Sequence, residues 1–247
     1  MNILAIDTSG TSASAALMDE HMVFAESSVT LADLRFKDRK THSETLMPMI
    51  EGLFEVSGMA MGAVDCIACT CGPGSFTGLR IGAATAKGLA FALGKPLIAV
   101  PTLDALAYNV AGINTSKTWV IPMLDARRGQ AYSAFYYMGE ERRTDYLAEP
   151  VDDLLKMLKN LISKDSHIIF LGEGARAYAG QVGQEVWPKD VTIAIAPARL
   201  NRVQAASVGA CAFNKQWPHE DESGFTLLYI RKPQAQRERE KRLACFK

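Results

Sequence analysis

Apolar runs alternate with helical patterns along the chain, in an order typical of an α/β protein. Residues 2–6 form a β-prone run that ends in a polar turn, and residues 11–18 resume as a strand of small residues. Buried strands are also predicted at residues 64–70 and 96–100, on either side of a helix that ends at Gly94. The pattern predicts a sheet that opens with a hairpin and is covered by helices.

A second helix is predicted over residues 42–56, because Thr41 and Glu44 have the spacing of a capping box. Pro48 is expected to bend this helix and Gly58 to end it. Its apolar arc is wider than one core face requires. The arc contains Leu46, Met47, Met49, Ile50, Leu53 and Phe54.

The helix that ends at Gly94 carries a stripe of small residues. Gly78, Gly82, Ala86 and Ala90 recur at intervals of four, so another backbone can approach this face closely. The stripe therefore predicts a close packing contact on one side of the helix.

A glycine-rich loop, residues 71–78, precedes this helix and invites comparison with phosphate-binding loops. Gly74 and Ser75 are the candidates for anion binding through backbone N–H groups. A Walker A loop requires Lys followed by Ser or Thr after its last glycine, and this chain has Leu79 and Arg80 there. The other interpretation is a structural strand-to-helix turn.

The pattern of the first half repeats after a polar stretch at residues 112–116. A β run at 119–124 ends in Asp125, as the first run ends in Asp7, and residues 130–137 predict the returning strand. We therefore expect two lobes, residues 1–111 and 112–247.

Four further elements are predicted in the second lobe. Asp152 should cap a helix, residues 167–171 and 191–196 should form strands, and residues 199–213 should form a long helix that packs back on the first lobe. The remaining tail, from Arg231 to the end, is dense in charges and is expected to be a solvated helix or a frayed end.

Composition limits the classes of function. The chain has 247 residues, with 27 Lys and Arg against 27 Asp and Glu, so it carries no formal net charge. A free-standing nucleic-acid binder relies on an excess of basic residues, so any RNA contact is expected to be shared with a partner. No stretch has the composition of a secretory signal or a membrane span, which predicts a cytosolic protein without membrane contact.

Three of the five cysteines lie in one apolar run, at Cys66, Cys69 and Cys71. In an extended strand the first would face away from the other two, so buried small hydrophobic residues are favoured over a metal site. Few cysteines in a chain of this length also suit a reducing compartment.

The candidate chemistry is sparse. Asp7, Thr8 and Ser9 at the first hairpin turn could hold a phosphate or a hydrated magnesium ion, although Asx and Ser/Thr turns give the same pattern for local reasons. Asp125 beside Arg127 and Arg128 predicts an ion-pair cluster. None of the four histidines has a catalytic context.

Several stretches of the chain resemble the TsaB (YeaZ) family, a branch of the superfamily of actin, sugar kinases and Hsp70. They are ILAIDTS at 3–9, HSETLMPMI at 42–50, CGPGSFTGLRIG at 71–82, AKGLAFALGKPLIAVPTLDALA at 86–107 and LDARRGQAY at 124–132. The resemblance implies an α/β fold of the duplicated actin-like (ribonuclease H-like) type, with two lobes of mixed sheets flanked by helices.

The resemblance also implies a function. Members of this family are subunits needed to form threonylcarbamoyladenosine (t6A) at adenosine 37 of ANN-decoding tRNAs. They bind and activate the catalytic paralogue TsaD and act together with the ATPase TsaE. TsaD-like chains carry a metal-binding His-x-x-x-His pair where this chain has Thr102 and Leu106. A non-catalytic subunit is therefore implied, with no cofactor of its own and with ATP and metal in the partner subunits.

The family forms its heterodimer through helices of the first lobe, and without TsaD the same surface is expected to give a homodimer. The implied interface residues are Leu46, Met49, Ile50, Leu53, Phe54, Gly78, Gly82 and Ala86. A Leu53→Glu variant should then lose the complex and keep the monomer folded. The alternatives are a metal-dependent glycoprotease-like peptidase, an ATPase, or a nucleotide-binding regulator that uses residues 7–9 and 172–174.

Overall fold

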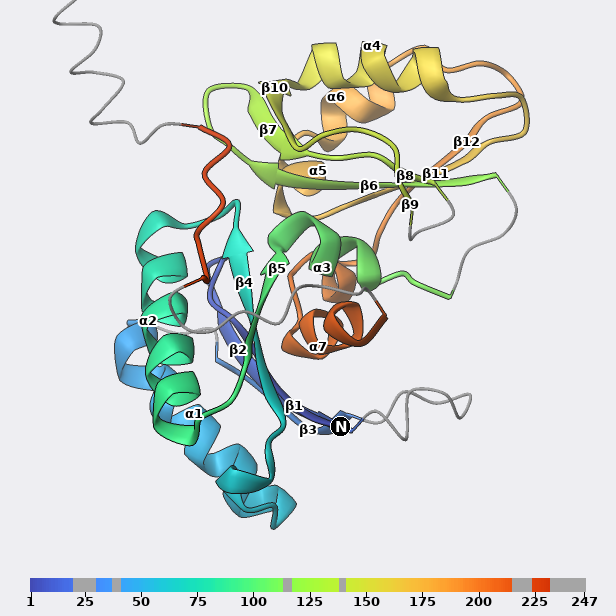
Figure 1. The fold of residues 1–247 in the computed structure, drawn as a ribbon. Coiled ribbons are helices and arrows are strands. Elements are labelled where there is room, and N and C mark those ends of the chain that lie inside the picture. Colours follow the sequence, from blue (N-terminus) through green and yellow to red (C-terminus); the bar gives the residue numbers. More distant parts are fainter. Residues whose placement is uncertain (20–29, 37–40, 113–116, 138–140, 215–223, 232–247) are drawn as a thin grey trace, which may run out of the picture.

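The computed structural model describes residues 1–19, 30–36, 41–112, 117–137, 141–214 and 224–231 (Figure 1). Two mixed sheets form its centre. The first sheet has five strands in the order β3 (Thr30–Phe36), β2 (Ala13–Asp19), β1 (Asn2–Asp7), β4 (Cys66–Gly72) and β5 (Leu97–Pro101).

The second sheet repeats this order. Its main path is β10 (Leu147–Pro150), β7 (Gln130–Ser133), β6 (Thr118–Asp125), β11 (His167–Leu171) and β12 (Thr192–Ile195), and β8 (Tyr136–Tyr137) and β9 (Glu141–Arg142) join it through β6. In both sheets the first three strands along the chain pair antiparallel, and the next two run parallel to the first strand. The repeat confirms the predicted duplicated two-lobe fold.

Helices cover both faces of the first sheet (Figure 1). α1 (His42–Ser57) and α2 (Phe76–Leu93) share one core with Leu4 and Ile6 of β1. α3 (Thr102–Tyr108) and α7 (Ala205–Asn214) share the other core with Ile3 and Ala5. Successive residues of a strand point to opposite faces, so the continuous apolar run of β1 reflects burial on both sides.

The second sheet is covered on its outer face by α4 (Val151–Leu161), α5 (Glu173–Ala177) and α6 (Ala179–Gln184). Its inner face meets α3 and α7, because Val120, Tyr136 and Leu171 belong to the same buried cluster as Ile3 and Ala5. The two lobes therefore share a core around α3 and α7. The lobe boundary at residues 111 and 112 stays a prediction.

α1 begins and ends as the sequence predicts, whereas α2 begins at Phe76, inside the predicted glycine loop, and only its end matches the prediction. The Glu44 carboxylate accepts hydrogen bonds from the Thr41 backbone N–H and hydroxyl, each at 2.8 Å. α1 continues through Pro48 to a left-handed Gly58, with φ 66°, and α2 ends at Gly94, with φ 62°.

The structure differs from the sequence-based expectations at three places in the connecting regions. Residues 30–36 form the edge strand β3, and the sequence pattern predicts no strand there. α4 starts at Val151 after Pro150, so Asp152 lies in its first turn and is not the cap. The helix predicted over 199–213 is replaced by a short 3-10 turn, Ala198–Leu200, and α7.

Asn201 explains why that helix is interrupted. Its buried Oδ1 accepts a hydrogen bond from the Gly172 N–H at 2.8 Å, and its Nδ2 donates to the Ala196 carbonyl at 2.7 Å. Side chains that bond to nearby backbone compete with helical hydrogen bonds. The segment is thereby tied to the second lobe before α7 returns to the first.

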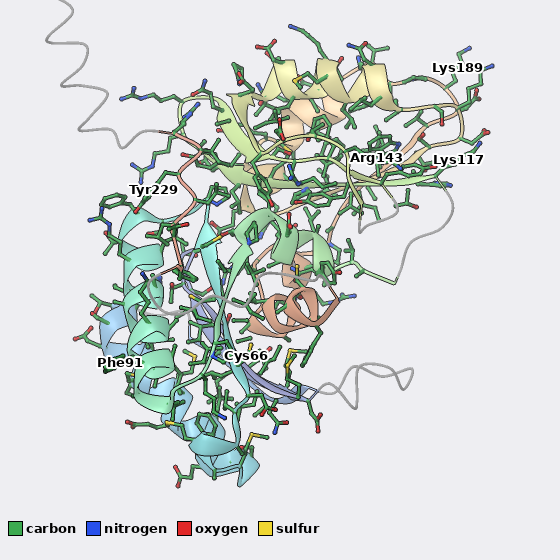
Figure 2. All side chains as sticks on the ribbon, viewed as in Figure 1. Cys66, Phe91, Lys117, Arg143, Lys189 and Tyr229 are labelled. Carbon is green, nitrogen blue, oxygen red and sulfur yellow. The ribbon has the colours of Figure 1, made fainter. Side chains whose placement is uncertain are left out.

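The strand cysteines lie as predicted. Cys66 packs in the core that contains α3 and α7, and Cys69 and Cys71 pack in the core that contains α1 and α2. Burial raises the pKa of the Cys66 thiol to about 12, so it stays protonated as a small hydrophobic group. Cys66 lies in the lower lobe of Figure 2.

Within the described ranges, none of the helices is both long and apolar enough to cross a bilayer. The tail from residue 232 onward, for which a helix or frayed end was expected, lies outside the described residues.

Candidate functional site

Two loops meet where β1 and β4 end at the same edge of the first sheet. One is the hairpin turn at residues 7–10 and the other is the glycine loop at residues 72–75. The Ser75 N–H donates a hydrogen bond to the Ser9 carbonyl at 2.7 Å. A Cβ on Gly74 would lie 2.5 Å from that carbonyl oxygen, so only glycine allows the two loops to pack this closely.

Asp7 lies at the centre of this junction and is 2% exposed. Its Oδ1 accepts hydrogen bonds from the Ser9 N–H at 3.0 Å and from the Thr70 hydroxyl at 2.8 Å. Burial raises the pKa of the Asp7 carboxyl, and the hydrogen bonds from Ser9 and Thr70 and the charge of His42 oppose this rise.

Thr8 ties the turn to α2. Its hydroxyl donates to the Gly78 carbonyl at 2.8 Å. A Cβ on Gly78 would overlap the Thr8 carbonyl oxygen, and one on Gly82 would overlap the Thr8 hydroxyl. The backbone that approaches the small-residue stripe of α2 is therefore the chain's own hairpin turn.

These contacts engage the polar groups proposed for anion or nucleotide binding. Asp7, Thr8 and Ser9 are each no more than 4% exposed and are bonded within the chain, whereas Gly74 and Ser75 are exposed. The Ser75 hydroxyl accepts from the Gly78 N–H at 3.2 Å and so caps α2. A phosphate at this turn would compete with existing hydrogen bonds, and anion binding here stays a prediction.

The second hairpin uses the same local turn. The Asp125 Oδ1 accepts from the Arg127 N–H at 2.7 Å, as Asp7 accepts from Ser9, and also from the Tyr178 hydroxyl at 2.8 Å. Partial burial and this carboxylate raise the pKa of Tyr178 to about 12. Within the described residues Asp125 forms no ion pair with Arg127 or Arg128, so the predicted ion-pair cluster is wrong.

Polar contacts also join the lobes beside these turns. The Thr11 hydroxyl of the first lobe donates to Glu173 Oε1 of the second lobe at 3.1 Å, and Arg202 lies 3.8 Å from the same carboxylate oxygen. Gly172 has a φ of +105° and packs against the Met123 carbonyl. A Cβ added at Gly172 would overlap this carbonyl oxygen. The edge between the lobes is therefore closely packed at residues 172–174.

Thr102 and Leu106 occupy the interior next to this edge and are both fully buried. The Leu106 Cδ2 lies 3.0 Å from where a Cβ of Gly172 would be, so its methyl fills space between the lobes. Leucine has no metal-binding atom. In the described part of the chain no three His, Cys, Asp or Glu residues come together as metal ligands. These residues do not fit the metal of a His-x-x-x-His pair.

Thr102 has one further peculiarity. Its hydroxyl is the only buried side-chain oxygen or nitrogen in the described residues without a hydrogen-bond partner. An unsatisfied buried hydroxyl is destabilising, and the sequence pattern gave no indication of it.

The residues expected at a partner interface are all buried inside the chain. Leu46, Met49, Ile50, Leu53 and Phe54 are between 0 and 8% exposed and belong to the core beneath α1 and α2, and Gly78, Gly82 and Ala86 are buried as well. These residues hold the helices on the sheet. A partner could contact the helices only through other residues, and partner binding itself stays a prediction.

The outward face of α2 carries a different set of residues. Ala84, Gly88 and Ala92 are exposed, and Phe91 is 75% exposed and points away from the sheet (Figure 2). Sequence reasoning missed Phe91, although its position on the helix opposite Ala86 was a readable signal. A large exposed ring among small residues forms an apolar contact surface.

The buried Asp7 predicts a pH-dependent difference in stability. Because its pKa is raised in the fold, the ionised form costs stability, and the wild-type chain loses stability as pH rises through that pKa. Asn at position 7 can keep both accepted hydrogen bonds without the charge. We expect Asp7→Asn to melt at a higher temperature at pH 7.5, and the difference to narrow as the pH falls through the raised pKa and the wild-type carboxyl takes up its proton.

Thermal melts of the wild type and Asp7→Asn at a series of pH values measure the difference in melting temperature. All other titrating groups, His42 included, are the same in the two proteins. A Thr70→Val control removes one hydrogen bond to Asp7 and should lower the melting temperature. A lower melting temperature for Asp7→Asn at pH 7.5 would contradict the expectation.

The chain is similar in sequence to proteins of tRNA threonylcarbamoyladenosine biosynthesis. The sequence profile described as "TsaD: tRNA N6-adenosine threonylcarbamoyltransferase" matches residues 37–223. The tRNA threonylcarbamoyladenosine biosynthesis protein TsaB of Bacillus subtilis (strain 168) is 37% identical over 176 residues, 70% of this chain and 71% of the relative. The TsaB of Escherichia coli (strain K12) is 35% identical over 140 residues, 57% of each chain.

Solved structures agree on the fold. A protein described as similar to peptidase YEAZ, from Pseudomonas aeruginosa, superposes with a TM-score of 0.68 at 25% identity, over 93% of this chain and 99% of that one. A second structure, described as YeaZ from Pseudomonas aeruginosa, superposes with a TM-score of 0.65 at 24% identity, again over 93% of this chain and 99% of that one. Both align across the two lobes.

Proposed function

Because the chain belongs to the TsaB (YeaZ) family of tRNA threonylcarbamoyladenosine biosynthesis proteins, we propose that it is a non-catalytic subunit that binds and activates TsaD. The modification would be formed at adenosine 37 of ANN-decoding tRNAs, with TsaE as a further component. ATP and metal would be held by the partner subunits.

One observation carries the non-catalytic role. The place of a metal-binding pair is taken by Thr102 and Leu106, and the Leu106 methyl packs against Gly172 of the second lobe. The neighbouring polar turn supports the same interpretation, because Asp7, Thr8 and Ser9 bond to the chain itself. Both sets of residues serve packing and internal hydrogen bonding, which supports a role without chemistry at this position.

The outward face of α2 is the surface proposed for TsaD. It offers Ala84, Gly88 and Ala92 for close backbone approach and Phe91 as a ring that a partner can bury. In the absence of TsaD the same face would pair two copies of the chain as a symmetric dimer. Contact with tRNA would be made within the complex.

We place the protein in the cytosol. Its four described cysteines are free and buried, which suits a reducing compartment.

Reconstitution tests the proposal. The purified chain alone should neither modify an unmodified tRNA nor hydrolyse ATP. Adding TsaD, TsaE and the enzyme that makes the threonylcarbamoyl adenylate should restore t6A, measured by mass spectrometry of nucleosides, and omitting the chain should abolish it. Restoration of t6A without the chain would refute the proposal.

An enzyme in its own right is the second candidate, as a peptidase or an ATPase. Its support is that one solved relative is described as similar to a peptidase. Cleavage of a peptide library or turnover of ATP by the chain alone would favour this candidate over the scaffold, provided that Asp7→Asn removes the activity.

A further inference from the structure

An exposed group of two aromatic rings and an arginine lies at the start of α2, and neither the fold nor the proposed function explains it. Phe76 is 42% exposed and Tyr229 is 43% exposed, with ring centroids 5.9 Å apart. The Arg80 guanidinium lies 3.8 Å from the centroid of the Phe76 ring, and its Nε donates to the Tyr229 hydroxyl at 3.4 Å. We call Phe76, Arg80 and Tyr229 the aromatic–arginine group.

The chain holds Tyr229 in place from both sides. Phe225, four residues earlier, is 2% exposed in the core beneath α1 and α2, and the Leu228 N–H donates to the Cys71 carbonyl at 2.8 Å. Arg231, two residues later, donates to the Ala126 carbonyl of the second lobe at 3.4 Å. Tyr229 therefore sits on a short segment that bridges the lobes (Figure 2). Because this segment is already held in place, binding a ligand there costs little further conformational entropy.

The surroundings of this group are rich in arginine. Arg231 is anchored on the hairpin turn that carries the exposed Arg127 and Arg128, whose φ values of 61° and 57° are favoured by glycine or asparagine. In the described residues none of these three arginines, nor Arg80, forms an ion pair.

The nearby carboxylate does not offset this excess. Asp125, at the turn, accepts hydrogen bonds from the Arg127 N–H and the Tyr178 hydroxyl, and within the described residues it forms no ion pair with Arg127 or Arg128. The uncompensated positive charge of this region calls for an anionic partner.

We infer that the aromatic–arginine group, together with Arg127, Arg128 and Arg231, binds single-stranded RNA. Unstacked bases pack on aromatic rings and guanidinium planes, while arginines neutralise the phosphates on either side. The arginines come from α2, the second hairpin and the bridge, so they extend along a strand of several nucleotides rather than around one mononucleotide. An acidic protein surface would pair with the arginines but would leave the rings without stacked partners.

The choice of RNA rests on the proposed function in tRNA modification. It also accords with the neutral charge of the whole chain, because a local patch needs help from a partner to bind RNA strongly. Phe76 and Arg80 lie on the same helix as the proposed TsaD surface. RNA could therefore be held between the two subunits.

Fluorescence anisotropy with the full chain, alone and with TsaD, tests the inference. The probe is a fluorescein-labelled RNA hairpin with a single-stranded loop, and a fully paired RNA of the same length is the comparison. Phe76→Leu and Tyr229→Leu should each weaken hairpin binding by about fivefold or more, because one stacked base loses its ring. Arg80→Gln should lower the slope of log K against log salt by about 1.

Matched controls lie on the second lobe, away from both proposed surfaces, and at the same ring. Val186→Ala and Lys189→Gln change an exposed apolar side chain and an exposed cation and should leave RNA binding unchanged, with and without TsaD. Tyr229→Phe keeps the ring and should bind as the wild type does. Millimolar ATP should not displace the hairpin, and the paired RNA should bind more weakly.

The results separate this inference from the proposed function. Equal affinity of wild type, Phe76→Leu and Tyr229→Leu would overturn the inference, as would failure of the wild type to bind the hairpin with TsaD present. Loss of TsaD co-purification in these two variants, with RNA binding retained, would identify a protein-docking surface instead. Failure of the wild type to capture TsaD would count against the proposed function alone.

Discussion

Gly78→Ala should lower the free energy of unfolding by about 3 kcal/mol, because the added methyl has no space. Its Cβ would overlap the Thr8 carbonyl oxygen, with Ser75 and His42 side-chain atoms also within 3.3 Å. The helix and the hairpin turn would have to separate, which breaks the hydrogen bond from the Thr8 hydroxyl to the Gly78 carbonyl. Thermal melts should show a decrease of roughly 10 °C for a chain of this size.

Gly88→Ala is the matched control on the same helix. Nothing lies within 4 Å of a Cβ at this position, so alanine should stabilise the helix by about 0.5–1 kcal/mol. The two substitutions are chemically identical and should have opposite effects. Similar melting temperatures for both variants would mean that α2 does not pack on the turn as described.

Phe91→Asp should weaken binding to TsaD by at least about tenfold if the outward face of α2 is the docking surface. A buried ring at the centre of an interface often contributes 2 kcal/mol or more, and aspartate would also have to be desolvated there. Phe91 is 75% exposed in the chain by itself, so the monomer should keep its melting temperature. Co-purification and titration by calorimetry measure the loss.

Val186→Asp makes a comparable change on the second lobe, where Val186 is 81% exposed, and should leave TsaD binding intact. Leu53→Glu, the substitution suggested by the sequence, is unsuitable as a probe. Leu53 is a fully buried residue of α1 in the core between this helix and the sheet, so a glutamate would unfold the monomer rather than only disrupt a complex. Unchanged binding by Phe91→Asp would exclude this face of α2.

Much of the fold was predictable because its signals are local. The capping box at Thr41 and Glu44, the glycines that end α1 and α2, and the repeated hairpin tipped by Asp7 and Asp125 each reflect the geometry of a few neighbouring residues. The opposite facing of Cys66 and Cys69 followed from strand alternation alone. The duplicated strand order then confirmed the expected architecture.

The candidate site was less predictable because its contacts are distant in the sequence. A wide apolar arc on α1 does not reveal whether the chain itself or a partner covers it. In the structure the arc packs against β2 and β3 of the first sheet. The small stripe of α2 correctly signalled close backbone approach but not that the backbone is Thr8. The bridge that carries Tyr229 depends on contacts across more than a hundred residues, which no local pattern encodes.

The path of α7 has a consequence for how the protein is made. The first sheet lies near the beginning of the chain, yet one of its faces is covered by α7, and Phe225 fills the core on the other face. A ribosome adds residues in order, so the first lobe leaves the exit tunnel long before its last packing elements are synthesised. Until then its sheet exposes apolar surface, and a message truncated before residue 205 would yield a first lobe in which α3 alone covers part of one face.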